Sequence, residues 1–313
     1  MSTDTQSSTS EKLAVLGCGL IGQSWAALFL SYGHDVSAWD PDPKARAALA
    51  AGVQHPLAQL AELGEGAERA GQLTICDTLE EAVAGAVLIQ ENASENVPLK
   101  QKLYASIEAL VSPDAMIASS TSSLTWSMLS EGMINKERLL TAHPFNPPHL
   151  MPLVELYGPS PAIVDRAAAL YGSMGRVCVR LRKDAVGHIA NRLSSALWRE
   201  AVNIVAEGIA DVAEVDAALV HGPGLRWSVI GSHMAYHLGG GAGGIGHYLA
   251  HLGPSQERRW ATLGTPSLTP EVCAQLVAGI QEEAAGRDIP QLEAERDSRL
   301  IAMLRARDAF AAP

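Results

Sequence analysis

The 313-residue chain has few aromatic side chains and a deficit of positive charge. Aromatic residues make up 5% of the sequence, and 23 Lys and Arg stand against 34 Asp and Glu, which gives a formal net charge of −11. Such a chain lacks the basic surface that holds nucleic acid or an anionic membrane, so neither is expected as a partner. A single bound phosphate needs only local donors, so the acidity does not exclude a nucleotide.

Cysteine is also scarce, and its spacing shows no paired motif. The four cysteines, Cys18, Cys76, Cys178 and Cys273, lie far apart in the sequence. This spacing argues against a disulfide framework and against a cysteine zinc site. A reducing compartment, the cytoplasm, is therefore expected.

Charge is absent from residues 13–33, a stretch about as long as a membrane span. Clustered glycines and the pair Gln23-Ser24 interrupt this stretch, and no basic segment precedes it. It is interpreted as a buried strand, a turn and a helix rather than as a signal peptide or a span. Residues 1–11 are rich in Ser and Thr and are expected to form a disordered tail.

Short apolar runs alternate with helical segments over residues 12–185. The runs are residues 13–16, 36–39, 73–76, 86–89, 115–118, 139–142 and 177–181. Each is nearly continuously apolar, as strands buried on both faces are. Strand–helix alternation predicts an α/β Rossmann domain with a doubly wound, mostly parallel sheet.

The strand pattern ends near residues 184–187, where we place a domain boundary. Helical periodicity over residues 186–313 predicts an all-α C-terminal domain, and a helical half this apolar is expected to be a dimerisation platform. The expected helices are a long one starting near residue 186, then 211–220, 227–238, 245–251, 270–285 and 291–307.

A glycine-rich turn follows the first expected strand, with the sequence Gly17-Cys18-Gly19-Leu20-Ile21-Gly22. In this G-x-G-x-x-G pattern the first glycine makes the turn, the second admits a pyrophosphate, and the third lets the helix pack on the strand. Asp40 ends the next strand, where an acid binds the adenine ribose. Asp40 favours NAD over NADP, although Lys44 and Arg46 lie nearby. We expect Gly17, Gly19, Leu20, Ile21, Gly22 and Asp40 to bind the cofactor.

A histidine lies at the carboxyl end of a later strand, the edge where doubly wound sheets bind ligands. This residue is His143, and a proline-rich connection follows it before Glu155 appears in a short apolar strand. If that strand runs back beside the first, the carboxylate meets the imidazole and fixes its tautomer, which leaves the other ring nitrogen as a base. A buried structural histidine is the alternative interpretation of His143 taken alone.

These motifs together resemble the L-3-hydroxyacyl-CoA dehydrogenase family. The resemblance covers residues 12–307 and includes His143-Pro-Phe-Asn-Pro, Leu153-Val-Glu155, Ser119-Ser-Thr-Ser122-Ser-Leu and Gly187-His-Ile-Ala-Asn191-Arg-Leu. It implies His143 as the base, Glu155 as its partner, and Ser122 and Asn191 as hydrogen-bond donors to the reacting oxygen. It also implies cofactor contacts from Glu91, Asn92, Lys100 and Asn146. It further implies that residues 186–313 serve substrate binding and dimerisation, so that the protein is a homodimer.

Two features separate the chain from members that act on coenzyme A thioesters. Residues 41–72 are short and net negative, whereas coenzyme A needs basic partners. The stretch Gly222-Pro-Gly-Leu-Arg226-Trp227 and the glycine run after it resemble the branch of the family that holds L-carnitine dehydrogenases, L-gulonate 3-dehydrogenases and lambda-crystallins. Arg226 is a candidate partner for a substrate carboxylate.

Aromatic side chains are candidates to face a quaternary ammonium group, with burial in the core as the alternative. The candidates are Phe145, Trp198, Trp227 and Tyr236.

The expected function is therefore NAD-dependent oxidation of a small L-3-hydroxy acid, carnitine- or gulonate-like. A true 3-hydroxyacyl-CoA dehydrogenase and a non-catalytic, crystallin-like NAD-binding protein are the alternatives.

Two histidine pairs have a spacing that allows metal binding, His233 with His237 and His247 with His251. No carboxylate nearby completes a familiar set of ligands, and polar helix faces explain both pairs. Hydride transfer to NAD needs no metal, and none is expected.

Overall fold

The apolar runs form the strands of one eight-stranded sheet in the computed structural model, which describes residues 11–309. The strands are β1 (Lys12–Leu16), β2 (Asp35–Trp39), β3 (Leu73–Ile75), β4 (Leu88–Glu91), β5 (Met116–Ser119), β6 (Leu139–Pro144), β7 (Leu153–Tyr157) and β8 (Val177–Arg180). Their order is β3-β2-β1-β4-β5-β6-β7-β8, and every neighbouring pair is parallel except β6 and β7. The predicted Rossmann-type, mostly parallel sheet is confirmed.

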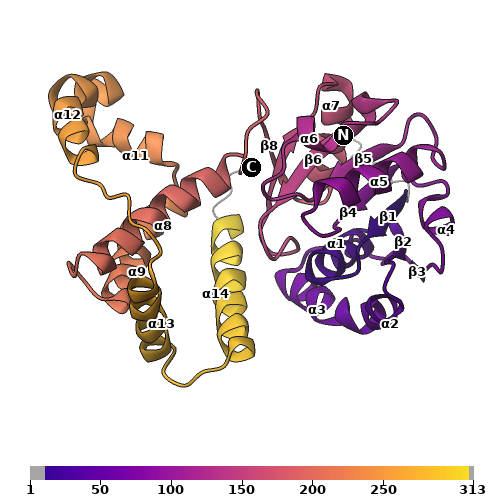
Figure 1. The fold of residues 1–313 in the computed structure, drawn as a ribbon, viewed down its shortest axis with the longest axis horizontal. Helices are drawn as coiled ribbons and strands as arrows, with labels where there is room; N and C mark the ends of the chain where they lie inside the picture. The colour runs from indigo at the N-terminus through magenta and orange to yellow at the C-terminus, as the bar shows by residue number, and fades with distance from the viewer. Residues whose placement is uncertain (1–10, 310–313) are drawn as a thin grey trace, which may run out of the picture. The chain divides into compact units, whose positions relative to one another are not determined.

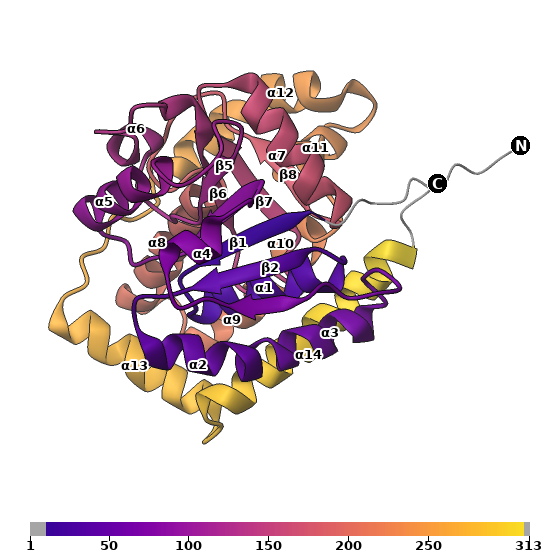
Figure 2. The same cartoon turned by 90° about the vertical axis from the view of Figure 1, so that its right-hand side faces the viewer.

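Both faces of the sheet are covered by helices, as Figures 1 and 2 show. Leu13 and Val15 of β1 belong to one buried cluster, and Ala14 and Leu16 belong to the other. Each leucine here is fully buried, which stabilises the fold by roughly 1.5–3 kcal/mol per side chain. The first cluster lies under α1 (Leu20–Ser31), α2 (Pro43–Gly52), α3 (Gln54–Leu63) and α7 (Pro161–Ser173), and the second under α4 (Leu79–Val83), α5 (Val97–Glu108) and α6 (Trp126–Leu129).

The uncharged stretch at residues 13–33 forms β1, the glycine turn and α1. Its apolar character comes from burial, because Trp25 and Phe29 of α1 are fully buried in the sheet core. Among residues 11–309, no helix combines the length and the apolar content needed to cross a membrane. The disordered tail expected over residues 1–11 falls, except for Glu11, outside the described residues.

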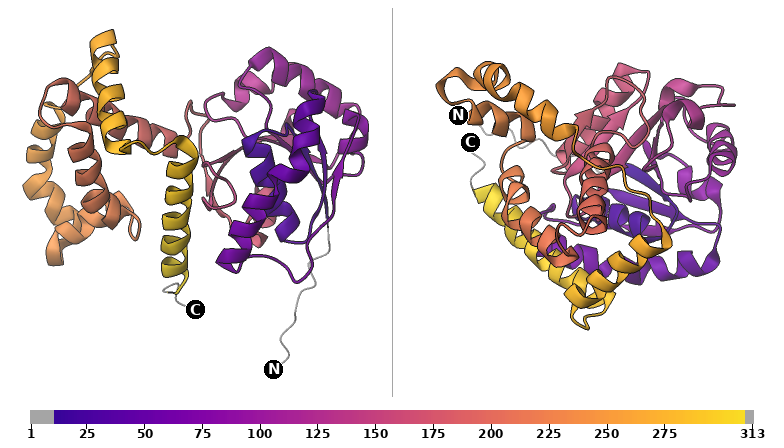
Figure 3. Two further views of the ribbon diagram at one scale, coloured as in Figure 1. Left: turned by 90° about the horizontal axis from the view of Figure 1, so that it is seen from below. Right: turned by 60° about the vertical axis from the view of Figure 1, so that its left-hand side comes forward.

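The chain divides into two compact units, residues 1–192 and 193–313. The helix α8 (Ala190–Ala206) starts at the end of the first unit and leads into the second. The second unit is built from helices (Figure 3). They are α9 (Val212–His221), α10 (Pro223–Trp227), α11 (Ser232–Gly239), α12 (Gly244–Trp260), α13 (Pro270–Ala284) and α14 (Ile289–Ala309).

One expected helix is wrong, since residues 227–238 do not form a single element. The helix α10 ends at Trp227, and α11 begins only at Ser232. Gly231 lies between them with extended backbone, φ −68° and ψ 161°, which is incompatible with a continuing α-helix. Apolar periodicity continues across this break and therefore hid it.

Candidate active site

The glycine turn after β1 has the geometry that a bound dinucleotide requires. Gly17 adopts φ +91°, and a Cβ atom there would lie 2.8 Å from the backbone of Asn92. A Cβ on Gly22 would lie 1.8 Å from the Gly17 carbonyl oxygen. A Cβ on Gly19 would instead point into open space. The first and third glycines are thus required by packing, and the second leaves the approach to the α1 N-terminus free for a pyrophosphate.

Asp40 stands beside this turn, immediately after β2, with its carboxylate fixed. The Cys18 N–H donates to Asp40 Oδ2 at 2.8 Å, and the Asp42 N–H donates to Asp40 Oδ1 at 2.9 Å. Arg46 donates to the Asp40 carbonyl oxygen at 2.7 Å. The acid therefore keeps a fixed place at the turn, at the position where an acid in Rossmann-type domains accepts from ribose hydroxyls and repels a 2′-phosphate. These residues fit NAD.

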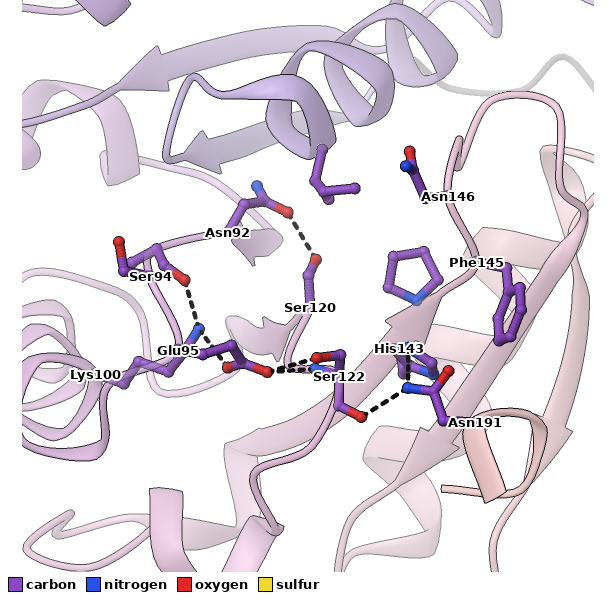
Figure 4. Close-up of a pocket in the computed structure, with 13 residues that line it drawn as sticks. Asn92, Ser94, Glu95, Lys100, Ser120, Ser122, His143, Phe145, Asn146 and Asn191 are labelled. Carbon is purple, nitrogen blue, oxygen red and sulfur yellow. Dashed lines mark hydrogen bonds and ion pairs between the residues drawn. The ribbon is translucent and has the colours of Figure 1, made fainter. Parts of the chain in front are cut away.

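A cavity of 510 Å³ opens at the carboxyl ends of the first unit's strands. Figure 4 shows the residues that line it. They are Ile21, Asn92, Ala93, Ser94, Glu95, Lys100, Ser120, Ser122, His143, Pro144, Phe145, Asn146 and Asn191. Parallel strands bring these residues together because β1, β4, β5 and β6 all end at one edge. Eight of the residues expected from the sequence to act on cofactor or substrate line this cavity: Ile21, Asn92, Lys100, Ser122, His143, Phe145, Asn146 and Asn191.

His143 reaches the cavity from β6, and Glu155 lies directly opposite it on β7. The two strands pair antiparallel with these residues in register, as the sequence predicted. Nδ1 of His143 lies 2.8 Å from Oε2 of Glu155, and both side chains are buried. A carboxylate can only accept, so Nδ1 carries the hydrogen. Nε2, on the side of Asn191, keeps its lone pair, which is the form required of a base.

Glu155 is held at its second oxygen as well. The N–H groups of Ile189 and Ala190 donate to Oε1 at 2.8 Å and 3.0 Å. Burial by itself raises the pKa of Glu155, but hydrogen bonds from His143, Ala190 and Ile189 outweigh it and bring the pKa below its ordinary value. The carboxylate is therefore ionised at neutral pH and oriented from both sides.

Asn191 and Ser122 lie next to His143 but are engaged with other groups. Nδ2 of Asn191 donates to the Ser122 carbonyl oxygen at 3.0 Å and lies 3.5 Å from Nε2 of His143. An amide nitrogen has two hydrogens, so one stays available for an oxygen bound at Nε2. The Ser122 hydroxyl donates to Oε1 of Glu95 at 3.0 Å. Ser122 must turn away from Glu95 before it can donate to a substrate.

Glu95 is a residue that the sequence analysis missed. Its Oε1 accepts hydrogen bonds from Thr121, Ser122 and Ser123, at distances from 2.6 Å to 3.2 Å. Partial burial raises the pKa of Glu95, and bonds from Ser122 and Thr121 and the charge of Lys100 together lower it below the ordinary value. The signal that points to it is position, because it follows the end of β4 at the ligand-binding edge.

Glu91, an expected cofactor contact, is not among the residues that line the cavity, and its role stays a prediction. It is fully buried, and its carboxylate accepts from Lys100 Nζ at 2.6 Å, Ser119 Oγ at 2.7 Å and the Ala93 N–H at 2.6 Å. The bonds to Ala93 and Lys100 fix the loop that follows β4. Lys100 lines the cavity, yet its ammonium group is also bound to the Ala93 carbonyl oxygen at 2.9 Å. Its charge is thus largely compensated within the protein.

The remaining expected substrate residues belong to the second unit. Trp198 lies on α8, whereas Arg226 and Trp227 lie on α10, and all three are exposed. Their role in substrate binding stays a prediction. Three of the four paired histidines of the second unit have local partners: His247 and His251 stack with ring centroids 4.1 Å apart, and His237 accepts from the Ile245 N–H at 3.1 Å.

The chain matches known proteins over nearly its whole length. It is 45% identical over 300 residues to the L-carnitine dehydrogenase of Streptomyces griseus, covering 94% of this chain and 89% of that protein. The L-carnitine dehydrogenase of Pseudomonas putida is 41% identical, with 94% and 92% covered. Among solved structures, 5-formyl-3-hydroxy-2-methylpyridine 4-carboxylic acid 5-dehydrogenase, an NAD+ dependent dismutase, matches with a TM-score of 0.82 and 28% identity, covering 95% of this chain and 98% of that chain.

The family follows from matches to both parts of the chain. Residues 12–185 match the NAD binding domain of 3-hydroxyacyl-CoA dehydrogenase, and residues 187–265 match its C-terminal domain. The protein is thus an NAD-dependent dehydrogenase that acts on a CH–OH group, as the fingerprint and the His143–Glu155 pair predicted. With the dinucleotide turn, the histidine–glutamate pair and the helical half in this order, the chain belongs to the 3-hydroxyacyl-CoA dehydrogenase family.

Proposed function

We propose that this protein oxidises the 3-hydroxyl group of a small, free L-3-hydroxy acid, with L-carnitine as the leading candidate. The observation that carries the chemistry is the His143 imidazole, whose Nδ1 is committed to Glu155 while the ring lines the cavity. The observation that favours carnitine is the similarity to several L-carnitine dehydrogenases at 38–45% identity.

The proposed mechanism divides the work between His143 and its neighbours. Bound NAD supplies the chemistry of a hydride acceptor for the hydrogen on the substrate carbon. His143 Nε2 takes the hydroxyl proton, so the alcohol loses a hydride and a proton and becomes a ketone. Asn191, and Ser122 once it turns from Glu95, donate to the oxygen as charge builds on it. Glu155 stabilises the imidazolium that results.

The charges around the cavity also favour a small cationic substrate over a coenzyme A thioester. Glu95 lines the cavity as an ionised carboxylate, whereas Lys100 is already paired with Glu91. Phe145 adds an aromatic ring whose centroid lies 5.8 Å from that of His143. An aromatic face and a carboxylate are the groups that attract a quaternary ammonium ion. We further propose that Arg226 pairs with the substrate carboxylate.

A substrate panel tests this proposal. NADH formation at alkaline pH should be seen with L-carnitine and not with 3-hydroxybutyryl-CoA. The panel also contains two further free acids, L-gulonate and L-3-hydroxybutyrate. R226A should raise KM for the free acid by about tenfold or more, because a charge-assisted pair is lost, while the exposed α12 arginine variant R258A should not. Turnover confined to the thioester would return the protein to the acyl-CoA branch.

We also propose that the second unit joins two copies of the chain. Exposed apolar side chains are frequent on its helices, including Leu197 on α8, Leu238 on α11, and Leu249 and Leu252 on α12. Apolar surface on this scale is typical of an interface rather than of a free surface. Light scattering after size exclusion should give twice the mass of one chain, and L249E with L252E should reduce it. A single-chain mass for the unmodified protein at micromolar concentration would contradict the dimer.

The cytoplasm remains our proposal for the compartment in which the protein acts. Its four cysteines are free, and two of them, Cys18 and Cys76, are buried. Burial raises the pKa of the Cys18 thiol to about 12, with a further contribution from Asp40, so this thiol beside the cofactor turn stays protonated. Free thiols at these positions fit a reducing environment.

A further inference from the structure

A second histidine is packed against the proposed base. The ring of His188 stacks on that of His143 with centroids 4.8 Å apart and an angle of 15° between the ring planes. His188 is only 3% exposed, and it lies in the connection between β8 and α8. Nothing in the mechanism above uses this side chain.

The surroundings of His188 favour its neutral form. Its Nδ1 is buried and has no hydrogen-bond partner within residues 11–309. Burial and the neighbouring His143 lower the pKa of His188, although Glu155 on β7, the Ser122 carbonyl and Asp184 in its own connection act in the opposite direction. Glu95 is connected to this region through the Ser122 hydroxyl, which donates to its carboxylate. His188 is therefore an uncharged aromatic ring at neutral pH.

A shared metal ion is a poor explanation of this cluster. Ligand atoms of His143, Glu155 and His188 all lie within 4.8 Å of one another, which is compatible with a metal site at first sight. However, the lone pairs of an imidazole lie in the plane of its ring, and the two rings here are nearly parallel. Their lone pairs then run side by side instead of meeting at one point, so the arrangement is a stack.

We propose that His188 is a positioning residue for the oxidation, providing a neutral aromatic face that stabilises the imidazolium formed on His143. This inference rests on the proposed function, in which His143 takes the substrate proton. A cation is attracted to an aromatic face when it lies within about 6 Å of the ring centroid. The interaction strengthens as the proton arrives and therefore acts on the transition state more than on the ground state.

The backbone at His188 links the stack to Glu155. Gly187 and His188 both adopt positive φ, +74° and +50°. This left-handed pair turns the chain so that the next two N–H groups, of Ile189 and Ala190, donate to Glu155 Oε1. The connection thus orients both partners of the base: the carboxylate through its backbone and the imidazole through the His188 ring.

Two substitutions of His188 separate the aromatic face from simple space filling. H188F keeps an aromatic ring and H188L does not. Neither side chain is branched at Cβ, so both variants experience the same left-handed backbone at residue 188. Because the stack favours protonated His143, H188L should move the acid limb of the kcat/KM profile for oxidation to lower pH by about half a unit to one unit. Its plateau kcat should fall about three- to tenfold through a weaker base, with Kd for NAD unchanged. H188F should restore most of both.

A second measurement keeps the test independent of turnover. The His143 imidazole can be titrated by NMR in histidine-labelled protein, with the resonance assigned by its loss in H143A. The midpoint should move to lower pH in H188L and return toward the unmodified value in H188F. Identical midpoints and acid limbs in all three proteins would overturn the role of His188, whereas activity surviving in H143A would overturn the proposed function itself.

Discussion

Replacing His143 with Ala should lower kcat for hydroxy-acid oxidation by about three orders of magnitude, while Kd for NAD stays within about twofold. The proposed base is lost, and its neighbour Asn191 cannot replace it, because the amide can donate to the substrate oxygen but has no basic nitrogen. The dinucleotide turn and Asp40 lie on other elements and remain intact. Steady-state kinetics gives kcat, and calorimetric titration gives Kd.

The control for this variant is another buried histidine outside the cavity. His34 is 5% exposed and precedes β2, and its Nδ1 accepts from the Glu11 N–H at 3.4 Å. H34A should lose stability like any buried truncation but should keep kcat within a few fold. If H143A turned over at more than about a tenth of the normal rate, the base would be misassigned and the non-catalytic interpretation of His143 would regain support.

Replacing Glu155 with Gln should also abolish most of the activity, by about two to four orders of magnitude in kcat, although the shape of the side chain is conserved. The N–H groups of Ile189 and Ala190 require an acceptor, so the amide oxygen takes the Oε1 position. The amide NH2 group then faces His143 and donates to Nδ1. The hydrogen on the ring moves to Nε2, and the base lone pair is lost from the cavity side.

The same variant has a signature in stability against pH. Hydrogen bonds hold the pKa of Glu155 below its ordinary value of 4.5, so its ionised form stabilises the fold above pH 4.5 and this contribution is lost as the pH falls through the folded-state pKa. The Tm difference between the unmodified protein and E155Q should therefore shrink below pH 4.5. A constant difference between pH 7 and pH 3.5 would show that the carboxylate charge contributes nothing to the fold.

Local sequence rules were sufficient for the sheet and for the dinucleotide turn. Strands buried on both faces must be apolar at successive positions, so the unbroken apolar run from Leu13 to Leu16 is enough to predict such a strand. The glycines of the turn are fixed by contacts of a few residues, such as Gly22 against the Gly17 carbonyl. Pairing of His143 with Glu155 also followed from sequence, because a short connection between two strands leads to an antiparallel return.

Contacts between distant segments were decided only by the tertiary structure. Glu95 and Ser122 meet because β4 and β5 end at the same edge, and Glu91 is buried because α5 brings Lys100 and Tyr104 onto it. His188 reaches His143 through a left-handed turn, for which a histidine gives no signal in the sequence. Periodicity and motifs report the environment of each segment, whereas hydrogen-bond partners and stacking depend on how the chain brings those segments together.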